Sequence, residues 1–226
     1  MTSPQEPTNP PCDSLGVTPD ERAARDGRSG LVVWFTGLSG AGKTTLAVSV
    51  ERRLFDDGYR TFLIDGDLLR AGLCSDLGFG AADRHENVRR AGVVSGLMAN
   101  AGLICLTALI SPFRADRLRA RSLLPAGSFL EVYVNAPLAV CESRDAKGLY
   151  RRARANEIPN FTGISSAYEP PEAPDLEVRT DLLTVEESIA AVLEALKERL
   201  LAMDENDSRA RRATAIAPKQ QAIFSR

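Results

Sequence analysis

The sequence is poor in the residues that hold metals and disulfide bonds. Its 226 residues include one histidine and four cysteines, and no two cysteines form a CxxC pair. By any usual ligand spacing, His85 cannot complete a zinc site with Cys12, Cys74, Cys105 or Cys141. We therefore expect reduced thiols and no structural metal.

The chain also lacks a strong net charge and a long apolar run. Its formal net charge of -2 provides no positive field for wholesale binding of nucleic acid or an anionic membrane. No stretch approaches the roughly 18 consecutive apolar residues of a membrane-spanning helix, and no basic region followed by an apolar run opens the sequence. We expect a cytoplasmic protein without nucleic-acid or membrane partners.

What the chain does contain is enough apolar sequence for one α/β domain, since 44% of its residues are hydrophobic. We place this domain at residues 29–203. Residues 1–28 are rich in Pro, Ser and charged residues, which predicts a flexible leader. Within it, Thr18 followed by Pro19 and two acidic residues favours a helical turn docked on the domain. Residues 204–226 are again polar, and we expect a loose tail.

Short β-branched apolar runs alternate with helical patterns through the domain, as βαβ units on a buried parallel sheet require. The expected strands are residues 31–36, 61–64, 103–110, 129–134 and 176–179. Thr184 and Glu187 have the spacing of a capping box and predict the start of the last helix. Residues 147–154 form a basic helix-like run, and the long loop 158–174 that follows is typical of a lid or binding loop.

A phosphate-binding loop follows the first expected strand. The spacing Gly37-x-x-x-x-Gly42-Lys43-Thr44 lies between a strand and a helix, as a Walker A loop does. Its glycines let successive N–H groups point at one anion, Lys43 reaches the β- and γ-phosphates, and Thr44 offers a hydroxyl to Mg²⁺. A chance glycine-rich turn is the weaker alternative. A binding-only, hydrolysing or regulatory P-loop protein is the stronger one.

Two carboxylates end the second strand, in Asp65-Gly66-Asp67. The carboxyl edge of an open α/β sheet is where ligands bind. Carboxylates at this edge can hold hydrated Mg²⁺ and orient or deprotonate an attacking hydroxyl. Asp and Gly are also common turn formers, so this motif by itself does not decide between turn and site.

Basic residues downstream favour an anionic acceptor. Arg84 and Asn87 lie three apart on an expected helix and share a face, and Arg70 can reach the same site from the preceding helix. Arginine suits sulfate and phosphate because its guanidinium makes paired, charge-assisted hydrogen bonds. For Arg89 and Arg90 a solvated helix face is the simpler interpretation.

Ser111 follows the third expected strand, which Pro112 prevents from continuing. We expect Ser111 to be exposed beside the phosphates. A serine before proline is usually a turn residue. Next to a γ-phosphate it could also bind the substrate or accept the phosphoryl group.

Together these segments closely resemble the adenylyl-sulfate (APS) kinase family, in family order over about residues 18–200. The resemblance rests on the loop 37–45, Asp65-Gly66-Asp67-x-x-Arg70, Asp76-Leu77-Gly78-Phe79, Ala82-Asp83-Arg84-x-Glu86-Asn87-x-Arg89-Arg90, Ile110-Ser111-Pro112-Phe113-Arg114, Lys147-Gly148-Leu149-Tyr150 and Asn160-Phe161-Thr162-Gly163-Ile164.

The resemblance implies an adenylate-kinase-like, five-stranded parallel sheet with a lid. It also implies transfer of the ATP γ-phosphate to the 3′-hydroxyl of adenylyl sulfate, with ATP and Mg²⁺ as cofactors, in a homodimer. The implied ATP-binding residues are Gly37, Leu38, Ser39, Gly40, Ala41, Gly42, Lys43, Thr44, Thr45 and Arg144. The implied substrate-binding residues are Asp65, Arg70, Phe79, Arg84, Asn87, Ile110, Ser111, Lys147 and Phe161.

The resemblance also assigns roles within the site. Lys43, Asp65, Asp67, Ser111 and Lys147 form the implied catalytic set, and Thr44 with Asp65 holds Mg²⁺. Phe79 and Phe161, which otherwise read as core, sandwich the adenine. Ser111 matches the position that the family labels a phosphoserine intermediate. Phosphoryl transfer needs mainly alignment and charge neutralisation, so direct attack suffices and the role of Ser111 stays open.

Two other hypotheses remain at this point. A different small-molecule P-loop kinase would need another acceptor pocket, which Arg70, Arg84, Asn87, Phe79 and Phe161 argue against. A catalytically silent regulatory partner of a sulfurylase has no need to keep Lys43, Thr44, Asp65 and Asp67 together.

Overall fold

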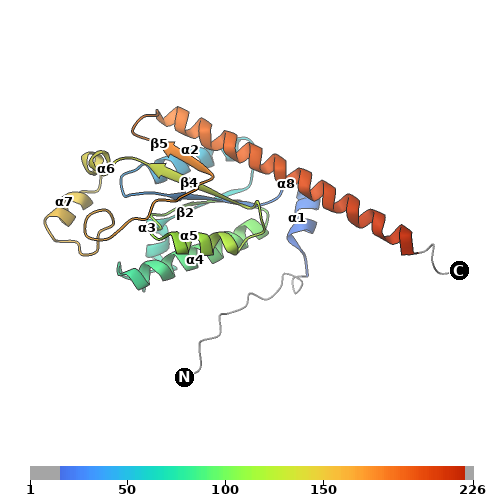
Figure 1. Cartoon of the computed structure of the whole chain (residues 1–226), viewed down its shortest axis with the longest axis horizontal. Coiled ribbons are helices and arrows are strands. Elements are labelled where there is room, and N and C mark those ends of the chain that lie inside the picture. The colour runs from blue at the N-terminus through green and yellow to red at the C-terminus, as the bar shows by residue number, and fades with distance from the viewer. Residues whose placement is uncertain (1–15, 222–226) are drawn as a thin grey trace, which may run out of the picture.

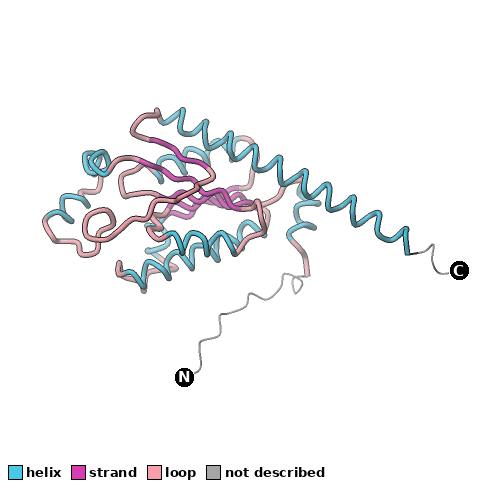
Figure 2. Tube along the Cα trace, viewed as in Figure 1, coloured by secondary structure: helices cyan, strands magenta, loops and turns pink. Residues whose placement is uncertain are grey.

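A parallel five-stranded sheet organises the part of the chain that the computed structural model describes, which is residues 16–221, with side chains for 16–203. The strands are β1 (Leu31–Thr36), β2 (Thr61–Asp65), β3 (Ile104–Ala108), β4 (Phe129–Asn135) and β5 (Leu176–Arg179). They lie in the order β2-β3-β1-β4-β5, and every neighbouring pair is parallel. Figure 2 shows the sheet with helices on both faces. The predicted fold class is confirmed.

The central strand β1 is apolar along its whole length because both of its faces are covered. Leu31, Val33 and Phe35 belong to one core cluster, and Val32 and Trp34 belong to the other. All five side chains are completely buried. This burial is what the unbroken apolar run in the sequence predicts.

The long helices divide between the two faces of the sheet (Figure 1). Helices α2 (Lys43–Asp56) and α8 (Val185–Gln221) pack on the first core, whereas α4 (Ala81–Asn100) and α5 (Arg114–Ser122) pack on the second. The shorter α3 (Gly66–Ala71) and α6 (Leu138–Arg144) follow the carboxyl ends of β2 and β4, and α7 (Leu149–Arg154) comes after α6. Within the described residues, none of the helices has the length and apolarity needed to span a bilayer.

The predicted helical turn near the N-terminus is present as α1 (Pro19–Asp26). Thr18 and Glu21 form a reciprocal capping box at its start. An ion pair of 3.0 Å between Asp26 and Arg60, and a 2.8 Å hydrogen bond from Arg28 to the carbonyl of Gly58, attach this segment to the domain. The first 15 residues of the expected leader lie outside the described residues.

The last helix begins as expected but ends much later. Thr184 and Glu187 form the predicted capping box, with the Glu187 N–H donating to Thr184 Oγ1 at 3.2 Å. Instead of a loose tail after Met203, the backbone continues as α8 to Gln221. The tail composition is rich in Ala and Arg, which are good helix formers once a helix is already under way. Residues 222–226 lie outside the described part.

Candidate active site

The carboxyl ends of the strands surround a cavity of about 1090 Å³. Residues following β1, β2, β3, β4 and β5 all contribute to its wall, together with the lid segment around α7. Most of the residues singled out in the sequence line it, namely Ser39, Gly40, Gly42, Lys43, Thr44, Thr45, Asp65, Asp67, Arg70, Phe79, Arg84, Asn87, Ile110, Ser111, Arg144, Lys147 and Phe161. One cavity therefore joins the predicted donor and acceptor sides.

The phosphate loop requires glycine at two close backbone approaches. Gly37 has φ 151°, and a Cβ there would lie 2.2 Å from the carbonyl oxygen of Val134. Gly40 has φ 74°, and a Cβ there would lie 2.8 Å from the carbonyl oxygen of Cys141. Three predicted ATP-binding residues, Gly37, Leu38 and Ala41, do not line the cavity. These three residues shape the loop from the side away from the cavity.

Lys43 is the first residue of α2 and is almost fully buried. Its Nζ donates to the carbonyl oxygen of Leu38 at 2.7 Å, so the ammonium lies against the loop itself. Burial lowers the pKa of Lys43 to about 8, against the opposing effects of Cys141 and Asp65. A phosphate placed in the loop would favour the charged form of this side chain.

Asp65 is held in a fixed orientation between the donor loop and α3. Its Oδ2 accepts a 2.8 Å hydrogen bond from Thr44 Oγ1, and its Oδ1 accepts one of 2.8 Å from the N–H of Asp67 as the cap of α3. Asp67 in turn pairs with Lys147 from the lid, and this contact raises the pKa of Lys147. The predicted metal and catalytic carboxylates therefore meet at one edge of the sheet.

The nucleotide side also contains Thr180, which the sequence reading missed. Its Oγ1 donates to the carbonyl oxygen of Ala41 at 2.7 Å, and Arg144 donates to its carbonyl oxygen at 2.6 Å. Arg144 therefore reaches the phosphate loop, where it donates to the carbonyl oxygen of Gly40 at 3.3 Å, and it is held there by Thr180. Because Thr180 directly follows β5, the rule that places ligands at strand ends was the signal that could have identified it.

Arginines from two helices converge on the acceptor side. Arg70 lies over the ring of Phe79 at 4.1 Å and donates to the carbonyl of Gly78 at 3.0 Å. Arg84 donates to the carbonyl of Phe79 at 3.0 Å and to that of Asn160 at 2.7 Å, which ties α4 to the lid loop. Burial, and then the positive charge of Arg70, lower the pKa of Arg84. The two guanidinium groups therefore lie in the wall of the same cavity.

Two buried polar atoms of this wall have no hydrogen-bond partner among residues 16–203. They are Asn87 Nδ2 and Thr162 Oγ1, and both residues line the cavity. An unpaired buried polar group is costly, and such groups gather at sites that bind a ligand or water. Asn87 was predicted from its spacing to Arg84. Thr162 was not, since a single threonine in a loop gives no sequence signal.

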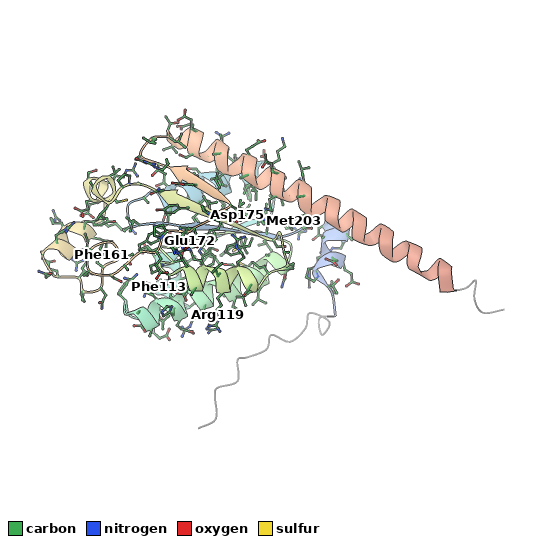
Figure 3. All side chains as sticks on the ribbon, viewed as in Figure 1. Phe113, Arg119, Phe161, Glu172, Asp175 and Met203 are labelled. Atoms are coloured by element: carbon green, nitrogen blue, oxygen red, sulfur yellow. The ribbon has the colours of Figure 1, made fainter. Side chains whose placement is uncertain are left out.

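The two predicted aromatic residues have very different environments. Phe79 is 55% exposed, whereas Phe161 is 8% exposed and makes an edge-to-face contact of 5.0 Å with Tyr150 of α7. Figure 3 shows Phe161 at the lid end of the molecule, beside α7. Reading Phe79 as ordinary core is therefore wrong. The Phe79 ring, over which the Arg70 guanidinium lies, is available to a ligand.

Ser111 is not exposed, contrary to the prediction from its place before Pro112. Its side chain is buried, and its hydroxyl accepts from Trp34 Nε1 at 3.1 Å and donates to Thr36 Oγ1 at 3.0 Å. Trp34 and Thr36 lie on the neighbouring strand β1, so parallel pairing of β1 with β3 brings their side chains next to the end of β3. The sequence around Ser111 alone could not show these partners.

Known proteins were compared with the chain. The family model described as adenylylsulphate kinase matches residues 29–179. The adenylyl-sulfate kinase of Acaryochloris marina is 56% identical over 183 residues, covering 81% of this chain and 89% of its own.

Solved structures agree with this match. The Mycobacterium tuberculosis APS kinase CysC in complex with AMPPNP and APS superposes with a TM-score of 0.72 at 44% identity, over 75% of this chain and 99% of that one. The hexameric APS kinase from Thiobacillus denitrificans gives a TM-score of 0.58 at 34% identity, over 76% of this chain and 29% of that one. With the family model covering well over half of its length, the chain belongs to the adenylylsulphate kinase family.

Proposed function

We propose that this protein transfers the γ-phosphate of Mg-ATP to the 3′-hydroxyl of adenylyl sulfate, producing 3′-phosphoadenylyl sulfate and ADP. The observation that carries the proposal is the single cavity in which a Walker A loop faces an arginine- and aromatic-lined wall. Many P-loop proteins share the first feature. The second provides cationic side chains for the sulfate-phosphate end and a planar slot for the base, as a nucleotide that carries sulfate requires.

On the donor side, the loop backbone and Lys43 bind the β- and γ-phosphates. Arg144, which donates to the carbonyl oxygen of Thr180, supports the loop. Burial lowers the pKa of Lys43 and so weakens its charge in the free protein. Binding of phosphate restores that charge. The ammonium then offsets the negative charge that moves with the transferred group.

On the acceptor side, Arg70, Arg84 and Asn87 bind the sulfate-phosphate end of the substrate, and Ile110 contributes to the neighbouring wall. The unpaired Nδ2 of Asn87 is a donor that an anionic oxygen would satisfy. Phe79 and Phe161 stack on the two faces of the adenine. Because Arg84 also holds the carbonyl of Asn160, it connects the anion pocket to the aromatic slot.

Asp65 is the group that orients the ribose 3′-hydroxyl and accepts its proton. Its two existing hydrogen bonds fix the carboxylate plane and leave further lone pairs for the substrate. Asp67 and Lys147 link the acceptor edge to the lid, so lid closure carries the Lys147 ammonium toward the transferring phosphate.

Mg²⁺ fits this edge because its donors are all oxygens. The described residues contain no cluster of three or more His, Cys, Asp or Glu side chains suited to a metal. Mg²⁺ usually takes one or two carboxylates together with substrate phosphates and water. Thr44 and Asp65, joined at 2.8 Å, would hold it in this way. When bound, the ion neutralises phosphate charge and positions the γ-phosphate.

Ser111 supports the site without acting as a covalent nucleophile. Its oxygen is buried, and its proton is committed to Thr36. An attacking hydroxyl needs an accessible oxygen and a nearby base. Direct in-line attack by the substrate hydroxyl needs neither from Ser111.

We also propose a cytoplasmic homodimer that binds neither nucleic acid nor membrane. The family resemblance and the small net charge of -2 support this assignment. Light scattering of the purified full chain tests the oligomeric state, and a monomer at micromolar concentration would contradict it.

A coupled assay of ADP release tests the proposed reaction. Adenylyl sulfate, AMP, adenosine and water are compared as acceptors at fixed Mg-ATP. We expect strong stimulation by adenylyl sulfate alone. Equal rates with all four would indicate hydrolysis, and stimulation by adenosine would indicate a different small-molecule kinase.

A further inference from the structure

The turn at Ser111 has a strained backbone. Its φ is 39°, in the left-handed region that residues other than glycine rarely occupy, and the following Pro112 restricts it further. Such strain persists only where the surrounding structure over-determines the conformation. Because Ile110, Ser111 and Pro112 line the cavity, whatever holds this turn also shapes the acceptor wall.

A chain of hydroxyl groups holds the Ser111 side chain. Tyr168 OH lies 3.0 Å from Thr36 Oγ1, and Thr36 donates to the carbonyl of Ile110 at 2.8 Å. Thr36 Oγ1 therefore accepts two hydrogen bonds, one from Ser111 and one from Tyr168, and donates one to Ile110. Burial raises the pKa of Tyr168, so its phenol remains a neutral donor. Every hydroxyl proton in this chain has an acceptor.

A buried guanidinium holds the Ser111 backbone. Arg117 is 2% exposed and donates to the carbonyl of Ser111 at 2.7 Å and to that of Glu169 at 2.7 Å. Its Nε donates to Glu131 on β4 at 2.8 Å, which balances the buried charge. One side chain thus bridges the strained turn and a segment more than 50 residues further along the chain.

That segment, residues 168–172, belongs to the loop 158–174, and further contacts attach it to the same turn. The Glu169 N–H donates to the carbonyl of Pro112 at 2.9 Å, and the Arg114 N–H donates to Glu169 Oε2 at 2.8 Å. Arg114 also pairs with Glu172 at 2.5 Å. Figure 3 labels Glu172 and Phe113 near these contacts.

We propose that Tyr168 and Arg117 are positioning residues for the acceptor side of the site. They hold Ser111 in its strained conformation, and this conformation sets the place of the Ile110–Pro112 wall against which adenylyl sulfate binds. The inference rests on the proposed function. It predicts that substitutions that disturb residues 168–172 raise KM for adenylyl sulfate and leave KM for ATP unchanged.

The test variant is Tyr168→Phe, which removes one donor and keeps the ring. We expect KM for adenylyl sulfate to rise roughly three- to tenfold, the effect of one lost neutral hydrogen bond, with KM for ATP changed less than about twofold. The matched control is Tyr133→Phe, because Tyr133 stacks on Tyr168 at 6.1 Å but lies outside the hydroxyl chain. A lower melting temperature with unchanged KM values would show a merely structural role and overturn the proposal.

A double-mutant cycle with Ser111→Ala separates action through Ser111 from a general loosening of the site. If Tyr168 acts through Ser111, the effects of the two substitutions on KM for adenylyl sulfate are less than additive. Fully additive effects would contradict the mechanism.

Arg117→Lys keeps a positive charge beside Glu131 and loses the fork that joins two carbonyls. We expect a larger rise in KM for adenylyl sulfate than in Tyr168→Phe, and a wild-type KM would count against the proposal. Should this variant fail to fold, Tyr168→Phe and its double-mutant cycle decide the question.

The two proposals fail in different ways. Wild-type protein without activity toward adenylyl sulfate would refute the proposed function. Active wild type with normal Tyr168→Phe kinetics would refute only the positioning role.

Discussion

The two halves of the cavity are built in different ways. The donor half consists largely of consecutive residues whose backbone does the binding, at a turn where Gly37 and Gly40 leave no room for a side chain. The acceptor half is a set of side chains from α3, α4, the end of β3 and the lid loop. Backbone geometry identifies a phosphate, while dispersed side chains identify which molecule receives it. Substitutions in the two halves should therefore separate ATP binding from acceptor binding.

The sharpest way to break this separation is Asp65→Asn, since Asp65 contacts both halves. We expect kcat to fall by about 10²- to 10⁴-fold, the usual contribution of a positioned general base. ATP should still bind, because the amide keeps an oxygen near Thr44. Stopped assays for kcat and calorimetry for ATP affinity check both parts. Asp57→Asn, at the end of α2, is the control. A rate near wild type would remove Asp65 from the chemistry.

Gly37→Ala tests the backbone-built half. The added methyl would lie 2.2 Å from the carbonyl oxygen of Val134, so the loop must shift. We expect ATP affinity to fall at least tenfold and the free energy of unfolding to fall by about 1–3 kcal/mol. Gly72→Ala, where a Cβ meets nothing within 4 Å, should change neither. Calorimetry and urea unfolding measure the two effects. Wild-type ATP affinity in Gly37→Ala would contradict the close approach.

Phe79→Ala tests the acceptor half of the cavity. Loss of stacking on the adenine should raise KM for adenylyl sulfate roughly tenfold, with KM for ATP unchanged. Stability should hardly change, because Phe79 is 55% exposed. Phe55→Ala, at a residue of α2 that is 60% exposed, is the matched control. Steady-state kinetics with each substrate varied in turn decide the matter, and equal rises in both KM values would argue against an adenine slot.

The pH dependence of ATP binding gives the smallest expected effect. The Lys43 pKa of about 8 means that the free protein loses this charge as pH rises through 8, while bound phosphate keeps it protonated. ATP affinity should therefore decline above pH 8, by at most about tenfold per pH unit. Calorimetry from pH 7 to about 9.5 measures it. Lys43→Arg should give a flat profile, and a flat profile in the wild type would contradict the lowered pKa.

The same shift has an effect of opposite sign on folding. Between pH of about 8 and the ordinary lysine value of 10.5, the unfolded chain binds more protons at Lys43 than the folded chain does. The contribution of this residue to the free energy of unfolding therefore rises with pH in that window.

The features that the sequence predicted well are those encoded locally. The strands, the helix cap at Thr18, the capping box at Thr184 and the phosphate loop each depend on residues close together in the chain. The family match confirms the resemblance drawn from seven short segments. The placement of Arg70, Arg84 and Asn87 on one wall required only helix spacing and the sheet-edge rule.

The features that it missed depend on contacts between distant segments. Ser111 was expected at the surface because its partners Trp34 and Thr36 belong to another strand. Thr180 and Tyr168 gave no motif, since each is defined by an atom that it touches on β1 or the phosphate loop. The helical continuation beyond Met203 was missed because polar composition alone does not distinguish a helix from a loose tail.

The position of the transferred phosphate is the direct test of transfer to the 3′-hydroxyl of adenylyl sulfate. Full-length protein is incubated with Mg-ATP and adenylyl sulfate, and the products are resolved by phosphorus NMR and mass spectrometry. We expect one ADP for each 3′-phosphoadenylyl sulfate. ADP formed without a phosphorylated acceptor, or phosphate attached at any position other than the 3′-hydroxyl, would contradict it.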